Sequence, residues 1–259
     1  MLKTLKMAAA ALVLAASGPA MANAEPLKVG FSPEAYPPFY IADAAGTWGG
    51  WEVEIVSAIC AEAKFECEMV PIPWDGLIPA LTTKKIDAIM NSMTITDERK
   101  KTIDFSDRYY AISAAVIGPK DQKFEATPEG LKGKVIGVQV STTHSAYAKK
   151  HFTEAAEIKE YQTQDEANQD LAAGRIDATQ ADSIALDAYL LSDQGKACCD
   201  LKGIVAADPA VLGPGVGAGL RKEDTAIKNR INAAIKAIRD NGKYAEITKK
   251  YFTYDIYGE

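Results

Sequence analysis

The sequence predicts an α/β fold divided into two lobes. Strand-like and helix-like segments alternate along the chain, which is the pattern of an α/β protein. Segment 80–88 (ALTTKKIDA) is echoed by 170–178 (DLAAGRIDA), because in both a helix ends in small or polar residues and an Ile-Asp-Ala strand begins. A weaker echo links the Val-Gly pair at 29–30 to the Ile-Gly pair at 136–137. The echoes indicate one design used twice, starting near residues 27 and 134.

The first elements are a strand, a helix and a second strand. We expect strands over 27–31 and 68–72, on either side of a helix over 51–63. Val56 and Ile59 recur at helical spacing within that helix and would lie on one apolar face. The helix would therefore pack on the first lobe.

A second helix and the first Ile-Asp-Ala strand follow. The helix is expected over 75–83, where the aspartate at its first position can cap it and Pro79 is tolerated near its start. The strand is expected over 86–90. Asp87 and its counterpart Asp177 are conspicuous, but we expect both to serve the start of their strands and assign them no binding role.

The end of the chain does not form a third lobe. A glycine-rich segment, 213–220, predicts a flexible strand-like connection, and two helices follow it. The first helix carries an apolar stripe and ends at the Asn-Gly pair 241–242, and the second covers 244–252. A stripe this apolar must be buried, so these helices should pack on the first lobe. The stripe consists of Ile227, Ile231, Ala234, Ile235 and Ile238.

This arrangement makes the chain cross between the lobes twice, near 111–115 and 207–214. Two crossings form a hinge, and the cleft between hinged lobes is a common ligand site. The predicted boundaries assign residues 25–112 to lobe 1, 113–212 to lobe 2 and 213–259 to lobe 1 again.

Residues 1–24 are predicted to be a signal peptide. Lys3 and Lys6 form a basic start, an apolar run covers 7–16, and Ala-Asn-Ala at 22–24 is a small-residue cleavage site. The alternative, a membrane anchor, is disfavoured because the run is too short to span a bilayer. The formal charge of −6 disfavours nucleic acid or anionic membrane as a partner. We expect an exported, soluble, monomeric chain that does not insert into the membrane.

Four cysteines in an exported chain suggest disulfide bonds. Cys60 and Cys67 lie at the end of a helix-like segment and the start of a strand-like one, so a short loop could join them. We favour this bridge over free thiols. Adjacent Cys198 and Cys199 form either a strained vicinal bond or a free pair. A catalytic thiol is disfavoured, since no histidine lies nearby in sequence.

Segment 91–100 (NSMTITDERK) is the main candidate for a binding motif. Thr96 is a good helix N-cap, but Arg99 places a cation near the positive end of the helix dipole. One interpretation is an anion held by the guanidinium, the Thr94 hydroxyl and free backbone N–H groups. The other is an arginine paired with a surface carboxylate.

Eight motifs occur along the predicted mature chain in one order and spacing: YPPF (36–39), GWEVE (50–54), WDGLIPAL (74–81), IDAI (86–89), TITDER (94–99), FS (105–106), GRIDA (174–178) and GAGLRK (217–222). With these motifs the chain, from about Leu27 to Tyr257, resembles the family 3 solute-binding proteins of ABC importers. Within that family it is most similar to the lysine/arginine/ornithine- and histidine-binding type. The resemblance implies a Venus-flytrap fold, the periplasmic-binding-protein architecture of two α/β lobes that close on an amino acid and then dock on a membrane permease. The Cys60–Cys67 bridge also matches the basic-amino-acid binders.

The resemblance implies roles for individual residues. Arg99 falls where the family clamps the ligand α-carboxylate, and Asp182 falls where a carboxylate receives the α-ammonium. The alternative for Asp182 is a cap on the helix starting at Ser183. The residues expected to assist the carboxylate are Ser92, Thr94, Thr142 and Thr143. Tyr36 and Trp74 fall where two aromatic rings sandwich the ligand side chain, and the alternative for both is a place in the hydrophobic core.

The chain departs from the family pattern at the side-chain end of the site. The basic-amino-acid binders carry an acidic residue before the Tyr-x-Pro-Phe turn, but this loop is one residue longer and only Glu34 is acidic. A cationic ligand follows if Glu34 faces the cleft, and an uncharged polar one if it faces solvent. Asn91 and Gln139 make this end of the site more polar. We also include Met93 among the predicted ligand-binding residues. His144 either touches the ligand or is a solvated loop histidine.

We therefore expect a periplasmic receptor for a polar, cationic L-amino acid that delivers its ligand to an ABC permease. No cofactor or metal is expected. One alternative is a binder of an uncharged polar amino acid or an amino-acid derivative. The other is a cyclohexadienyl-dehydratase-like lyase on the same fold, whose substrate prephenate has no amine for Asp182 to receive.

Overall fold

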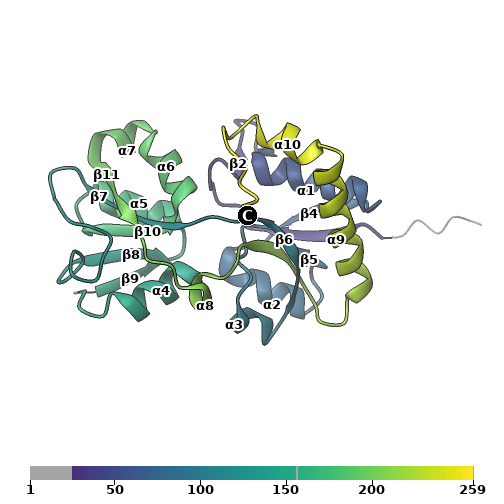
Figure 1. Ribbon diagram of the computed structural model, residues 1–259, viewed down its shortest axis with the longest axis horizontal. Helices are drawn as coiled ribbons and strands as arrows, with labels where there is room; N and C mark the ends of the chain where they lie inside the picture. The colour runs from purple at the N-terminus through teal and green to yellow at the C-terminus, as the bar shows by residue number, and fades with distance from the viewer. Residues whose placement is uncertain (1–24, 156, 259) are drawn as a thin grey trace, which may run out of the picture.

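The computed structural model describes residues 25–155 and 157–258, so the predicted signal peptide lies outside the described residues. Two α/β lobes lie side by side, with both the purple N-terminal strand and the yellow C-terminal helices in the same lobe (Figure 1). Each lobe contains a five-stranded sheet. The predicted two-lobe α/β fold is therefore confirmed.

Lobe 1 has the sheet order β4-β1-β5-β12-β6, in which β1, β4 and β5 are parallel and β12 is antiparallel. Its strands are β1 (Leu27–Phe31), β4 (Cys67–Pro71), β5 (Ala88–Ile89), β6 (Asp104–Tyr110) and β12 (Val216–Leu220), with a small β2 (Ile41–Ala42)–β3 (Trp48–Gly49) hairpin. Its helices are α1 (Trp51–Glu62), the 3₁₀ turn η1 (Trp74–Gly76), α2 (Leu77–Thr82), α3 (Asp97–Lys100), α9 (Thr225–Asp240) and α10 (Lys243–Thr248).

Lobe 2 has the sheet order β9-β8-β10-β7-β11, with the first three strands parallel and the last two antiparallel to their neighbours. Its strands are β7 (Ala114–Pro119), β8 (Val135–Gln139), β9 (Glu157–Tyr161), β10 (Ala178–Asp182) and β11 (Cys199–Ile204). Its helices are α4 (Thr143–His151), α5 (Gln164–Ala172), α6 (Ser183–Leu190), α7 (Asp193–Cys198) and α8 (Pro209–Leu212).

The sequence echoes correspond to equivalent positions in the two sheets. Asp87 accepts a hydrogen bond from the backbone N–H of Lys28 at 3.1 Å, and Asp177 accepts one from Val135 at 2.8 Å. Each aspartate thus fastens the start of its strand to the neighbouring parallel strand, β1 in lobe 1 and β8 in lobe 2, as expected.

The two echoed glycines also share a structural reason. A Cβ on Gly30 would collide with the Ile86 side chain, and one on Gly137 would collide with Ile176. The isoleucine of each Ile-Asp-Ala motif therefore packs directly on β1 in lobe 1 and on β8 in lobe 2.

The chain passes between the lobes at 111–113, after β6, and again at 213–215, between α8 and β12. Each passage feeds an antiparallel strand into the other sheet: β7 pairs with β10 in lobe 2, and β12 pairs with β5 in lobe 1. A bridge between Thr94 and Val216 joins the second passage to the loop after β5. The hinge therefore lies against the segment that carries the predicted anion-binding motif.

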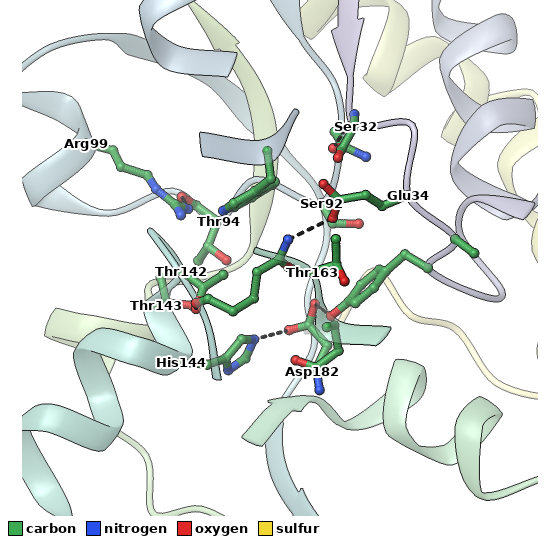
Figure 2. A pocket seen from close by; sticks show the side chains of 16 residues that line it. Ser32, Glu34, Ser92, Thr94, Arg99, Thr142, Thr143, His144, Thr163 and Asp182 are labelled. Carbon is green, nitrogen blue, oxygen red and sulfur yellow. Dashed lines mark hydrogen bonds and ion pairs between the residues drawn. The ribbon is translucent and has the colours of Figure 1, made fainter. Parts of the chain in front are cut away.

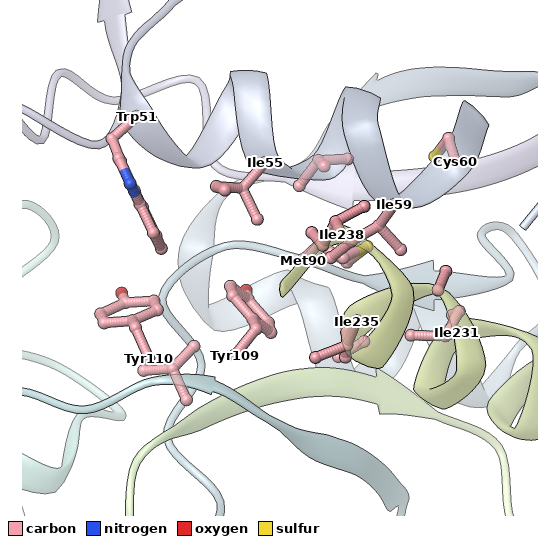
Figure 3. Close-up of a cluster of buried hydrophobic side chains, with 14 of the residues drawn as sticks. Trp51, Ile55, Ile59, Cys60, Met90, Tyr109, Tyr110, Ile231, Ile235 and Ile238 are labelled. Atoms are coloured by element: carbon pink, nitrogen blue, oxygen red, sulfur yellow. The ribbon is translucent and has the colours of Figure 1, made fainter. Parts of the chain in front are cut away.

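The C-terminal helices pack on lobe 1, as the apolar stripe predicts. Ile231, Ile235 and Ile238 of α9 are buried against Ile55 and Ile59 of α1 (Figure 3). This core holds α1 firmly beneath the cleft.

Two local expectations were not met. Asp75 does not cap a helix, because it lies inside the η1 turn and α2 begins after Gly76 without a side-chain cap. The 86–90 strand is shorter than expected, since only Ala88–Ile89 pairs in the sheet.

Both cysteine pairs form disulfides: Cys60–Cys67 joins α1 to β4, as predicted, and the Cys198–Cys199 pair that the sequence left open forms the vicinal bond.

Candidate functional site

A cleft between the lobes collects residues from both halves of the chain. It lies beyond the carboxyl ends of parallel strands, since Ser32 follows β1, Asn91 follows β5 and Asp182 ends β10. Ligands of open α/β sheets bind at this position. The lining residues, drawn in Figure 2, are Ser32, Glu34, Ala35, Tyr36, Trp74, Asn91, Ser92, Thr94, Arg99, Gln139, Thr142, Thr143, His144, Thr163, Gln164 and Asp182.

Arg99 reaches the cleft from the one-turn helix α3. Its Nη1 donates to the Thr94 carbonyl at 2.8 Å and its Nη2 to the Ser141 carbonyl of lobe 2 at 3.1 Å. The guanidinium lies over the Trp74 ring, with Cζ 5.6 Å from the centroid. Burial lowers its pKa to about 10, and the charge of Asp182 opposes that shift. It remains a cation at neutral pH, and it forms no ion pair with a carboxylate within the described residues.

Asp182 is the acid on the opposite lobe. It occupies the N-cap position of α6, but its side chain makes no capping hydrogen bond. One carboxylate oxygen instead accepts from the Tyr36 hydroxyl at 2.9 Å, and the other lies 3.2 Å from Nε2 of His144. The side chain is buried and directed into the cleft (Figure 2). The alternative in which the Asp182 side chain caps α6 is therefore wrong.

The start of α4 faces the same space. Thr142 caps this helix, because its hydroxyl accepts from the backbone N–H of Ser145 at 3.1 Å. Thr143 and His144 are the first two helical residues, and both are buried. The positive end of a nine-residue helix therefore adjoins the cleft, which favours an anionic group there. His144 is not a solvated loop residue: it lines the cleft and contacts Asp182.

Glu34 lies on the side of the cleft opposite Arg99 (Figure 2), and it meets Gln139 of the other lobe. Gln139 Nε2 donates to Glu34 Oε2 at 2.8 Å and to the carbonyl of Gln162 at 2.9 Å. Nearby, the Asn91 side chain accepts from the backbone N–H of Ser32 at 2.8 Å, which ties the ends of β1 and β5 together. The longer first loop therefore presents its only acidic residue to the cleft.

Direct hydrogen bonds hold the lobes together around the cleft. The contacts are Tyr36–Asp182, Gln139–Glu34 and Arg99–Ser141. Each uses a polar group that could instead bind a ligand. Exchange of these bonds for ligand contacts would let a small polar molecule become the link between the lobes.

Met93 is the predicted binding residue that the structure does not place in the cleft. Ser92 and Thr94 line it and are half-buried, whereas Met93 is buried in the lobe 1 core. Met93 belongs instead to the apolar cluster that contains Leu77 and Ile103, so its side chain serves the packing of lobe 1.

Sequence reasoning missed four lining residues, namely Ser32, Ala35, Thr163 and Gln164. Thr163 could have been found, because it forms a capping box with Glu166 that marks the start of α5. Gln164 donates to Asn168 and Thr179 at 3.0 and 2.9 Å, and nothing local in the sequence marks it.

Comparison with known proteins agrees with this geometry. Residues 27–254 match the family model of the bacterial extracellular solute-binding proteins, family 3. The chain belongs to this family. The family 3 chain is 42% identical to the L-arginine-binding protein of Pseudomonas aeruginosa over 99% of both chains. It is 37% identical to the histidine-binding periplasmic protein of Escherichia coli, over 95% of this chain and 96% of that one.

A solved structure leads to the same assignment. The family 3 chain superposes with a TM-score of 0.80 on a periplasmic binding protein of Salmonella typhimurium described as having high arginine specificity. The two are 30% identical, over 89% of this chain and all of that one.

Two further observations concern residues 25–155 and 157–258. None of their helices is both long enough and apolar enough to cross a membrane. They contain no group of three or more His, Cys, Asp or Glu residues arranged to hold a metal ion.

Proposed function

We propose that this family 3 protein is the substrate-binding protein of an amino-acid ABC importer and that it binds a cationic L-amino acid, with arginine the first candidate. The observation that carries the choice of ligand is Glu34, which lines the cleft and contacts Gln139. An acidic group there suits a ligand side chain that ends in a cation. The arginine- and histidine-binding relatives support the same class.

The ligand backbone would be held from both lobes. Arg99 and the start of α4 suit the α-carboxylate, since a guanidinium fork and helix N–H groups both favour an anion. Asp182 suits the α-ammonium, which supplies N–H donors only. A bound amino acid would therefore bridge a cation of lobe 1 and an anion of lobe 2, and closure would strengthen both contacts by excluding water.

The ligand side chain would extend toward Glu34. Trp74 already has the Arg99 guanidinium near its face, at 5.6 Å from the centroid. Aromatic faces attract cations, so Tyr36 and Trp74 are suited to enclose a cationic side chain, as the family resemblance implies.

A periplasmic location and transient docking on a permease are part of this proposal, as is the monomeric state. The N-terminal sequence and the periplasmic relatives support the location. We also propose a receptor and not an enzyme. The cyclohexadienyl-dehydratase-like alternative predicts prephenate turnover, and measurable turnover by the purified protein would favour it over the receptor.

Calorimetry of refolded protein tests the ligand. Titration with arginine, lysine, ornithine, histidine and glutamine should give micromolar or tighter binding for at least one cationic amino acid. Glu34→Gln should weaken arginine binding by tenfold or more, because a charge-assisted hydrogen bond contributes about 1.5–3 kcal/mol. Glutamine binding should change by less than about threefold. Tighter binding of glutamine than of any cationic amino acid by the wild type would refute the cationic assignment.

A further inference from the structure

Glu52 is a buried carboxyl group directly behind the cleft. It lies in the first turn of α1 and is 0% exposed. The usual partners of a buried carboxylate are cations, but no Lys, Arg or His of the described residues forms an ion pair with it. Its oxygens instead accept hydrogen bonds from the Ser92 backbone N–H, the Ser92 hydroxyl and the Tyr109 hydroxyl. Burial at this cost indicates a purpose other than stability.

These hydrogen bonds fix the conformation of Ser92. Its φ of 52° lies in the left-handed region, which a non-glycine residue adopts rarely. Glu52 Oε1 holds its backbone N–H at 2.8 Å, and Oε2 holds its hydroxyl at 2.7 Å. Both contacts come from one rigid helix, so Ser92 is clamped where it lines the cleft.

The clamp also sets the chemistry of the Ser92 hydroxyl. A hydroxyl group has one proton to donate and two lone pairs that accept. With its proton given to Glu52, the oxygen can only accept from other groups. It is therefore unsuited to assist a carboxylate, which is also an acceptor, and suited to an N–H group of a cation.

We propose that Glu52 is a positioning residue of the binding site, which fixes Ser92 as a hydrogen-bond acceptor for an ammonium or guanidinium N–H of the ligand. The inference rests on the proposed function, because it requires a cationic amino acid in the cleft. It changes the role expected of Ser92 from the carboxylate end of the ligand to a cationic end.

The protonation state of Glu52 gives this inference a measurable signature. Burial raises the pKa of Glu52 to about 7, and the charge of Asp182 adds to the increase. The hydrogen bonds from Tyr109 and Ser92 act in the opposite direction and lower this pKa. The other titratable groups of the described residues that interact with it are phenols with raised pKa values: Tyr36, Tyr40 and Tyr110.

Protonation would reverse the hydrogen bond to Ser92. A neutral Glu52 donates to the Ser92 oxygen, so the serine proton turns toward the cleft and opposes a ligand N–H. A cationic ligand therefore binds the ionised form better and lowers the pKa of Glu52 on binding. By linkage, affinity should fall as the pH decreases below about 7, by at most tenfold per pH unit, and binding near pH 7 should release protons.

The experiment is arginine titration by calorimetry between pH 6 and 8.5, in buffers of different ionisation enthalpy. The proteins are the wild type, Glu52→Gln and the matched control Glu54→Gln. Glu54 lies on the same helix, but it pairs with Lys250 and Tyr251 outside the cleft. The amide of Glu52→Gln can still accept from Ser92 N and Tyr109, but it donates to the Ser92 hydroxyl.

We expect the wild type and Glu54→Gln to release protons near pH 7 and to lose affinity at lower pH. Glu52→Gln should bind arginine about tenfold or more weakly at pH 8, because the serine proton then points at the ligand. It should also lose the Glu52 share of the proton release. The difference in proton release between the two proteins is therefore the quantity that measures the Glu52 share.

Equal proton release by wild type and Glu52→Gln overturns the inference, and so does equal affinity at pH 8. If Glu52→Gln does not fold, the wild type still decides: binding of arginine with no pH dependence between 6 and 8 overturns the inference. Failure of the wild type to bind any cationic amino acid contradicts the proposed function instead.

Discussion

Replacement of Asp182 by asparagine tests the two-lobe binding geometry most directly. The change removes the charge but keeps the size and one oxygen of the side chain. The Asp182 side chain makes no capping hydrogen bond, so the start of α6 should be preserved in Asp182→Asn. The matched control is Asp187→Asn on the same helix, where the carboxylate is exposed and does not line the cleft.

The expected loss follows from the surroundings of Asp182. The residue is only 8% exposed, so water cannot replace a lost contact. Removing one partner of a buried charge pair costs about 2–5 kcal/mol, and retention of one oxygen places the expected value in the lower part of that range. A loss of about 2–4 kcal/mol corresponds to a 30- to 1000-fold increase in Kd.

The assay is calorimetry with arginine on refolded proteins at pH 7.5, with circular dichroism to verify the fold. Asp182→Asn should show the increase in Kd, and Asp187→Asn should bind as the wild type does. A well-folded Asp182→Asn protein whose Kd stays within about threefold of wild type would refute the assignment of Asp182 to the ammonium.

Two further predictions concern single side chains of lobe 1. Arg99→Ala should lose about 2–5 kcal/mol of arginine-binding free energy, because it leaves the ligand carboxylate desolvated without its guanidinium. The control is Arg175→Ala, which removes only a surface ion pair with Asp170. An Arg99→Ala protein with wild-type affinity would show that the ligand carboxylate lies elsewhere. The second prediction concerns stability, since the folded-state pKa of Glu52 is raised from 4.5 to about 7. Its favourable share of stability is complete below about pH 4.5 and is lost as the pH rises through about 7. Between pH 5 and 8.5, the free energy of unfolding of the wild type should therefore fall by roughly 1–3 kcal/mol relative to that of Glu52→Gln, as measured by thermal unfolding. Stability curves of the two proteins that run parallel with pH would contradict this.

Much of the fold could be predicted because its determinants are local or repeated. The Ile-Asp-Ala motifs specify a strand start, and Asp87 and Asp177 serve the same backbone contact in each lobe. The α9 stripe identifies a helix that must be buried, and α9 packs on α1 accordingly. Asp75 shows the limit of local reasoning, since a residue suited to an N-cap lies inside a 3₁₀ turn that continues into α2.

The binding residues were mostly found through the family resemblance, and their surroundings were not. Nothing in the sequence pairs His144 with Asp182, or directs Glu34 at Gln139 across the cleft. Glu52 has the sequence signature of an ordinary acid in the first turn of a helix. Its burial depends on β6 and on the loop after β5, which lie far from it in sequence.

The sequence by itself determined the α/β alternation, the repeated lobe design and the residue types available to bind a dipolar solute. Those properties follow from short-range periodicity and from turn chemistry, which a linear pattern contains. The tertiary structure alone decided which polar groups converge, because residues from separate strand ends and opposite lobes meet only after folding. It therefore decided that Glu34 faces the cleft, that Met93 does not, and that a buried Glu52 holds Ser92.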